Sequence, residues 1–303
     1  MKSINIVLVL SAALLVTGCA GPEARLAKIS REVSAAGREH NLDTLNKLSS
    51  SIKAEDLSPE RMGGYSDNAI NSMYDALLTI SLYLPDEEAY ALRLESAFNE
   101  KVRRGKYAGD EVERMFNVFT MSGLFNKAVS VRQGFTDKSL PEVPEIAAAD
   151  ISAAGWWIYE VSTDGKKAAL RSLPKSGQRM IMVMRPGCLF AEMAADAIFA
   201  DPELGPAFRA NGFMLTRKFE PVDVGYIKKR FNFNAVYIAR KSGDFPGISL
   251  LRISPTFYFV KDGQILDKFS GWSNEDGGAY AKDKIRKGLA AIRIETKTGV
   301  RPD

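Results

Sequence analysis

The stretch RMIMVMRPGCLFAEM, residues 179–193, decides how the C-terminal half of this 303-residue chain is interpreted. Its first six residues include a continuous apolar run, which is typical of a buried strand. A Pro-Gly break follows, and Cys188 then opens a segment with the apolar spacing of a helix. The stretch therefore predicts a strand, a turn and a helix that begins at a cysteine, a position where unpaired N–H groups and the helix dipole favour a thiolate.

The segments around this stretch extend the pattern. A tryptophan-rich run with an Asp-Gly turn predicts a β-hairpin before it, at residues 154–174. After it, the predicted order is helix, strand, helix, two strands and helix, at residues 188–200, 212–219, 223–231, 250–272 and 277–292. This half of the chain is therefore expected to be an α/β domain.

Two motifs in this half resemble the thioredoxin-like superfamily. Cys188 takes the first cysteine position of the family's Cys-x-x-Cys motif, and FADPEL at residues 199–204 is similar to the end of the motif helix in one subgroup. Ser254 and Pro255, with the strand after them, match the family's cis-proline strand. The resemblance covers roughly residues 155–296 and implies a thioredoxin-like fold in which Pro255 lies beside Cys188 and shapes a groove for a partner peptide.

The motif departs from the family at the position of its second cysteine, which is Ala191. A Cys-x-x-Cys pair attacks a disulfide with one thiolate and releases the mixed disulfide with the other, so Cys188 can take only the first step. Leu189 and Phe190 are bulky apolar neighbours that disfavour a thiolate, whereas the charge of Arg185 favours one. A self-contained dithiol cycle is excluded, and a single reactive thiol stays possible.

The first residues resemble the signal peptide and lipobox of bacterial lipoproteins. A positive start and an apolar run over residues 4–16 lead into Val-Thr-Gly-Cys, which ends at Cys19. In that family the cysteine and the new amino terminus are acylated, and acyl chains anchor at roughly 0.8 kcal/mol per buried methylene. The resemblance implies a signal peptide at 1–18, a lipidated tether at 19–22 and, because Ala20 follows the cysteine, the outer membrane if the cell is Gram-negative. A plain secretory peptide is the alternative.

Residues 23–135 have helical periodicity, including two helices that meet near Gly123. An echo between MYDALLTISLYLP and MFNVFTMSGLFNK suggests stacked helical hairpins of the tetratricopeptide type, and a plain helical bundle is the alternative. Prolines mark a linker at 136–154, and a short tail follows at 297–303. The predicted fold class is therefore an α+β two-domain protein, with all-α hairpins or a bundle before an α/β thioredoxin-like domain.

Several classes of function have no support in the sequence. The net charge is +4, with basic residues scattered in short groups, so no nucleic-acid surface is expected. The single histidine, His40, is expected at an exposed helix end, and no Cys/His site forms unless the two halves meet. No clustered ligands indicate zinc, and no glycine-rich loop indicates bound phosphate. No cofactor is therefore expected.

Two functions stay open. The first is a non-catalytic envelope adaptor or assembly factor, which binds the membrane through lipid at Cys19 and binds protein partners through the groove and the helical half. The second is a single-thiol redox protein, in which Cys188 forms a mixed disulfide or a sulfenic acid that an outside thiol resolves. Trp156 and Trp157 could line a small-molecule site, although packing is their more common use. An insertion at 231–247 is expected near the active end of the domain.

Overall fold

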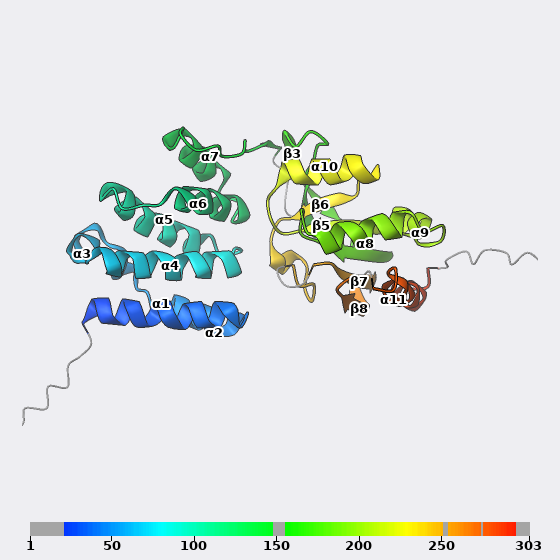
Figure 1. The fold of residues 1–303 in the computed structure, drawn as a ribbon, viewed down its shortest axis with the longest axis horizontal. Helices are drawn as coiled ribbons and strands as arrows, with labels where there is room; N and C mark the ends of the chain where they lie inside the picture. Colours follow the sequence, from blue (N-terminus) through cyan, green and yellow to red (C-terminus); the bar gives the residue numbers. More distant parts are fainter. Residues whose placement is uncertain (1–20, 148–154, 251–253, 274, 295–303) are drawn as a thin grey trace, which may run out of the picture.

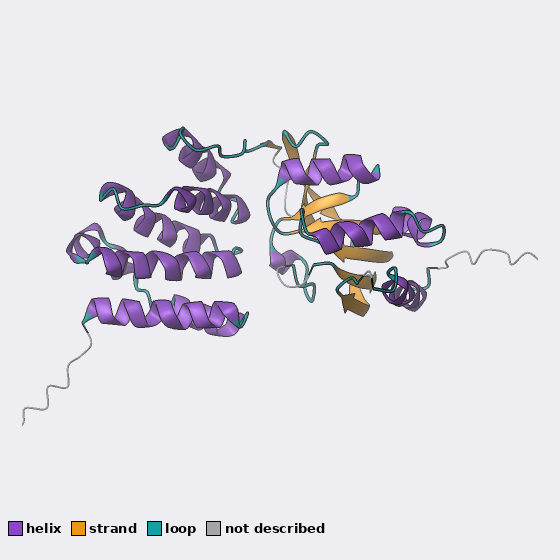
Figure 2. Ribbon diagram, viewed as in Figure 1, coloured by secondary structure: helices purple, strands orange, loops and turns teal. Residues whose placement is uncertain are grey.

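The computed structural model describes residues 21–147, 155–250, 254–273 and 275–294. Cys19 and the predicted signal peptide lie outside the described residues. The described chain is mixed α/β: a group of helices comes first, and an eight-stranded mixed sheet with further helices follows (Figures 1 and 2).

The N-terminal half is a layered stack of helices, and α4 packs between α1 and α5 (Figure 1). The helices are α1 (Pro22–Arg38), α2 (Leu42–Ser49), the 3₁₀ helix η1 (Ala54–Leu57), α3 (Pro59–Gly64), α4 (Asp67–Tyr83), α5 (Glu88–Arg103), α6 (Gly109–Met121) and α7 (Phe125–Gly134). The two similar segments, residues 73–85 and 115–127, begin in α4 and α6, and each of these is the first helix of a packed pair, α4–α5 or α6–α7.

Local sequence explains where these helices begin and end. The side chain of Asn41 accepts a hydrogen bond from the Thr44 N–H at the start of α2, and Ser66 accepts one from the Ala69 N–H at the start of α4. Gly123 has φ +78° between α6 and α7, a left-handed conformation that costs glycine little. The predicted pair of helices that meet near Gly123 is confirmed.

The C-terminal half is built on the eight-stranded sheet, with strand order β1-β3-β2-β6-β5-β4-β7-β8. The strands are β1 (Glu145–Ala147), β2 (Trp156–Val161), β3 (Lys167–Leu173), β4 (Gln178–Val183), β5 (Gly212–Thr216), β6 (Val236–Ala239), β7 (Thr256–Lys261) and β8 (Gln264–Ser270). The helices are α8 (Leu189–Phe199), α9 (Leu204–Asn211), α10 (Pro221–Phe231), the 3₁₀ helix η2 (Ser242–Asp244) and α11 (Ala279–Ala291). The predicted hairpin, the strand–turn–helix at residues 179–193 and the closing helix are confirmed.

The structure adds elements that the sequence did not predict. Residues 145–147 of the predicted linker form β1, which pairs parallel with β3 at the edge of the sheet. The predicted insertion contains β6, which lies between β2 and β5 and is parallel to β5. Because β4, β5 and β6 are parallel and successive, their crossovers place α8 and α10 on the same face. Arg230 of α10 accordingly bonds both Glu192 and Asp196 of α8.

Two apolar cores cover the two faces of the sheet. One face packs on the helices α8 to α11 through residues such as Met182, Met214 and Phe257. The other face packs on the segment after β6 through residues such as Phe245 and Ile248. The central strands β4, β5 and β7 are therefore buried on both faces, which explains the continuous apolar run in β4.

The topology brings three chain segments to one end of the sheet. Strand β4 is parallel to β5 and antiparallel to β7, with Val183 opposite Leu215 on one side and opposite Thr256 on the other. The carboxyl ends of β4 and β5 therefore meet the amino end of β7. In Figure 1 this end of the sheet faces the helical stack.

Candidate functional site at the end of the central strands

Cys188 is the residue immediately before α8. Its N–H donates a 3.0 Å hydrogen bond to the Arg185 carbonyl, and its carbonyl accepts one from the Glu192 N–H at 3.0 Å. Gly187, with φ +74°, makes the sharp turn that separates β4 from the helix. The short Arg-Pro-Gly connection thus fixes the thiol at the amino end of α8.

Ser254 connects this turn to β7. The Cys188 thiol donates a hydrogen bond to the Ser254 carbonyl, with 3.6 Å between sulfur and oxygen, and the Arg185 N–H donates to the Ser254 hydroxyl oxygen at 2.9 Å. The peptide bond between Ser254 and Pro255 is cis. The structure thus brings together all four residues that the sequence singled out in this domain: Arg185, Cys188, Ser254 and Pro255.

The surface beside the thiol is apolar. Leu189 is 68% exposed and Phe190 is 54% exposed. Cys188 is less exposed than either: it is half-buried, and its thiol contacts Ser254. Ala191, in place of the second cysteine, is fully buried. Cys188 is the only free thiol among the described residues, so this site holds one sulfur and an exposed apolar pair.

An ion pair joins this end of the sheet to the helical half. Nη2 of Arg217, the residue after β5, donates to the Asp86 carboxylate at 3.0 Å, and the Gly243 N–H donates to the other oxygen at 3.0 Å. Burial alone would raise the pKa of Asp86, but the Ser242 and Gly243 N–H groups and the charge of Arg217 outweigh it and lower the pKa. The Asp86 carboxylate, from the helical half, therefore hydrogen-bonds two residues of the C-terminal half.

A cavity of about 270 Å³ lies along this contact between the halves. Its polar lining comes from the ends of β4, β5 and the cis-proline loop, and consists of Arg185, Thr216, Arg217, Lys218 and Ser254. The cavity therefore adjoins the Cys188 turn through two residues, Arg185 and Ser254, that hydrogen-bond each other.

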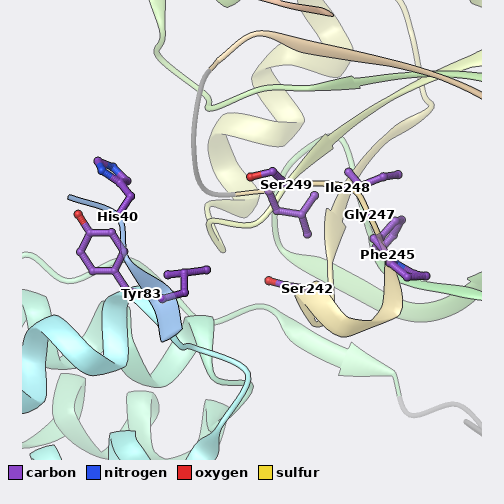
Figure 3. Close-up of a pocket in the computed structure, with 10 residues that line it drawn as sticks. His40, Tyr83, Ser242, Phe245, Gly247, Ile248 and Ser249 are labelled. Atoms are coloured by element: carbon purple, nitrogen blue, oxygen red, sulfur yellow. The ribbon is translucent and has the colours of Figure 1, made fainter. Parts of the chain in front are cut away.

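A second cavity, of about 340 Å³, lies farther along the same contact (Figure 3). His40 and Tyr83 line it from the helical half, opposite the segment that runs from Ser242 to Leu250. The Ser242 hydroxyl is buried without a hydrogen-bond partner in the described part of the chain. His40 is exposed, as predicted, and its ring packs edge-on against Tyr83 at 5.6 Å, so the only histidine belongs to this cavity.

Trp156 and Trp157 are buried packing residues. Trp156 is 2% exposed and stacks on Phe245 at 5.9 Å, while Trp157 is buried beneath the Arg240 guanidinium. Because Phe245 lies in the predicted insertion, the insertion covers one face of the sheet and lines the contact with the helical half. It does not lie over Leu189 and Phe190, which are exposed.

The described residues contain no group of His, Cys, Asp and Glu that could hold a metal ion. None of the helices described is both long enough and apolar enough to cross a membrane.

Arg217 and Asp86 are the site residues that sequence reasoning missed. The signal for Arg217 was available, because Arg217 and Lys218 directly follow an apolar strand, at the same level as the Cys188 turn.

No protein-family model, curated protein or solved structure matches this chain.

Proposed function

We propose that this protein is a lipid-anchored envelope protein whose C-terminal half is thioredoxin-like and binds a protein partner without dithiol catalysis. The observation that carries the proposal is the exposed apolar pair, Leu189 and Phe190, beside the single thiol of Cys188 and the Ser254–Pro255 cis bond. Contiguous exposed apolar surface rimmed by polar groups is typical of protein-interaction sites.

The thioredoxin-like assignment rests on the order β5-β4-β7-β8 and its connections. Helix α8 follows β4 and begins at Cys188, the cis bond precedes β7, and α11 packs on β7 and β8. Strand β6 and the position of α10 beside α8 are additions to the pattern that the sequence predicted. The proposed thioredoxin-like fold therefore applies to strands β5, β4, β7 and β8, which carry the site.

The chemistry of the site favours binding over exchange. Release of a mixed disulfide within the protein needs a second thiol, and Ala191 offers a methyl group buried in the core instead. The one hydrogen bond that the Cys188 sulfur makes in the described chain uses the thiol as a donor to a carbonyl. The surface is thus equipped to hold a partner's apolar side chain rather than to cleave its disulfide.

The single-thiol function is the second candidate, because Cys188 lies at a helix amino terminus and is partly accessible. Its step would be attack of the Cys188 thiolate on a partner disulfide. One new S–S bond forms, the partner's second sulfur leaves as a thiolate, and an outside thiol later releases Cys188.

Site-specific crosslinking separates the two functions. A photo-crosslinking amino acid placed at Phe190 in the native envelope is expected to give partner adducts, and the same residue at Tyr280, 66% exposed on α11, is expected to give none. The adducts should persist in a Cys188→Ala background. Adducts that require Cys188 and disappear under reductant would establish the single-thiol function, and equal adducts from both positions would refute a specific binding surface.

Anchoring needs its own test. Cys19→Ala is expected to abolish incorporation of labelled fatty acid, because the acylated side chain is removed. Incorporation of the label at the wild-type level in this variant would contradict the lipid anchor at Cys19 and leave the partner-binding proposal standing.

A further inference from the structure

A buried charged side chain, Arg217, lines the cavity of about 270 Å³ between the two halves. Arg217 is 3% exposed, and Nη2 bonds Asp86. Its Nε is buried and has no hydrogen-bond partner among the residues described. A buried donor left unsatisfied is destabilising, and more so when the group is charged, so an acceptor that reached it would be bound favourably.

Among the residues that the structure describes, the charges that line the cavity do not balance. Three cationic side chains line it: Arg185, Arg217 and Lys218. Two carboxylates pair with them, Asp86 with Arg217 and Glu220 with Lys218. Three positive and two negative charges leave one positive charge, so the cavity matches a monoanion.

The rest of the lining is apolar and comes from both halves. Leu82 and Met121 face the cavity from α4 and α6, and Val183, Met184 and Leu250 face it from the sheet side. A bare inorganic anion would leave this apolar surface without a partner, whereas an acid with a short hydrocarbon group would cover it.

We infer that this cavity binds a small organic carboxylate with an apolar group, and that the carboxylate accepts a hydrogen bond from Arg217 Nε while the apolar group packs between Leu82 and Met184. A guanidinium group suits a carboxylate because its N–H groups form a planar fork. The inference stands independently of partner binding at Leu189 and Phe190. A free short-chain acid and the carboxyl-terminal end of an apolar peptide both present a carboxylate next to an apolar group.

The test is calorimetric titration of the full-length chain in a non-ionic detergent. Hexanoate is expected to bind saturably, and hexan-1-ol, hexylamine and acetate are expected to bind at least tenfold more weakly, because each lacks the charge or the apolar group. N-acetyl-alanyl-leucine and its amide form the peptide arm. Tighter binding of the free-acid peptide than of hexanoate identifies a chain end as the source, and the reverse identifies a free acid.

Two variants and a control locate the site. Arg217→Lys keeps a positive charge near Asp86 but removes the Nε–H donor. Leu82→Asp places a carboxylate in the cavity wall at a side chain that is 36% exposed, so the protein is expected to fold. Both are expected to weaken hexanoate binding at least tenfold. Lys241→Gln alters an ion pair with Glu88 elsewhere in the contact between the halves and is expected to change nothing.

If Arg217→Lys fails to fold, hexanoate binding by the Leu82→Asp variant alone tests the location of the site. The inference is overturned if neither hexanoate nor the free-acid peptide binds saturably, if hexan-1-ol binds as tightly as hexanoate, or if Leu82→Asp leaves the affinity unchanged.

Discussion

Asp86 and Arg217 are 131 residues apart in the chain, and the carboxylate of one accepts a 3.0 Å hydrogen bond from the guanidinium of the other. Asp86 lies in the turn between α4 and α5, and Arg217 directly follows β5. The Arg217 side chain is 2% exposed and that of Asp86 is 25% exposed. This pair therefore fixes the helical half against the end of the sheet where Cys188 and Ser254 meet.

Asp86→Asn should destabilise the protein strongly. The amide keeps the shape of the side chain but leaves the Arg217 charge buried without a counter-charge, which costs about 3 kcal/mol in the free energy of unfolding. Urea denaturation monitored by tryptophan fluorescence gives the value. Glu88→Gln is the control, since its pair with Lys241 is exposed and should contribute less than about 1 kcal/mol. Equal losses in both variants would contradict a special role for the buried pair.

Ala191→Cys should create a pair of thiols able to close a disulfide. Cys188 precedes α8 and Ala191 lies in its first turn, and a Cys-x-x-Cys pair at a helix start is within bonding reach. Mild oxidation should remove two hydrogens, as read by mass spectrometry and loss of thiol labelling. Ala194→Cys, equally buried but one turn farther along α8, should keep both thiols. Failure of the first variant to oxidise would argue against a thioredoxin-like turn.

Stability should fall in acid because of Glu100. Hydrogen bonds from Arg103, with those from Arg104, lower the pKa of Glu100 to about 2. The folded protein thus favours the charged carboxylate, and its contribution is complete above the unfolded pKa of about 4.3 and is lost as the pH falls towards 2. Glu100→Gln should be less stable than the wild type at pH 7, with the gap closing between about pH 5 and pH 2. A gap that does not change with pH in denaturation curves would refute this account.

Gly288→Ala should disturb the packing of α11 on the sheet. A methyl group there would lie 2.2 Å from the ring of Phe259, a buried side chain with little room to move. Overpacking of this kind costs about 1–3 kcal/mol in the free energy of unfolding. Gly134→Ala in α7, where nothing lies within 4 Å, should instead be neutral or stabilise by about 0.5 kcal/mol. Thermal denaturation of the two variants tests the contrast.

The sequence by itself determined the elements whose signal is local. Periodicity gave the helices of the first half, the hairpin at β2 and β3, and the strand–turn–helix that ends in α8, because each pattern spans enough residues to be distinctive. The resemblance also placed Cys188, Ser254 and Pro255 at one site. Strands β1 and β6 were missed because three or four residues carry little periodicity of their own, and only neighbouring strands make them part of a sheet.

Only the tertiary structure determined how the two halves contact each other. Asp86 follows a proline and precedes a helix, so its local context explains it without a distant partner. Its ion pair with Arg217 and the cavity beside that pair depend on the packing of α4 and α6 against the ends of β4 and β5. Residues this far apart in sequence share no local pattern, and only the folded chain brings their charges within hydrogen-bonding distance.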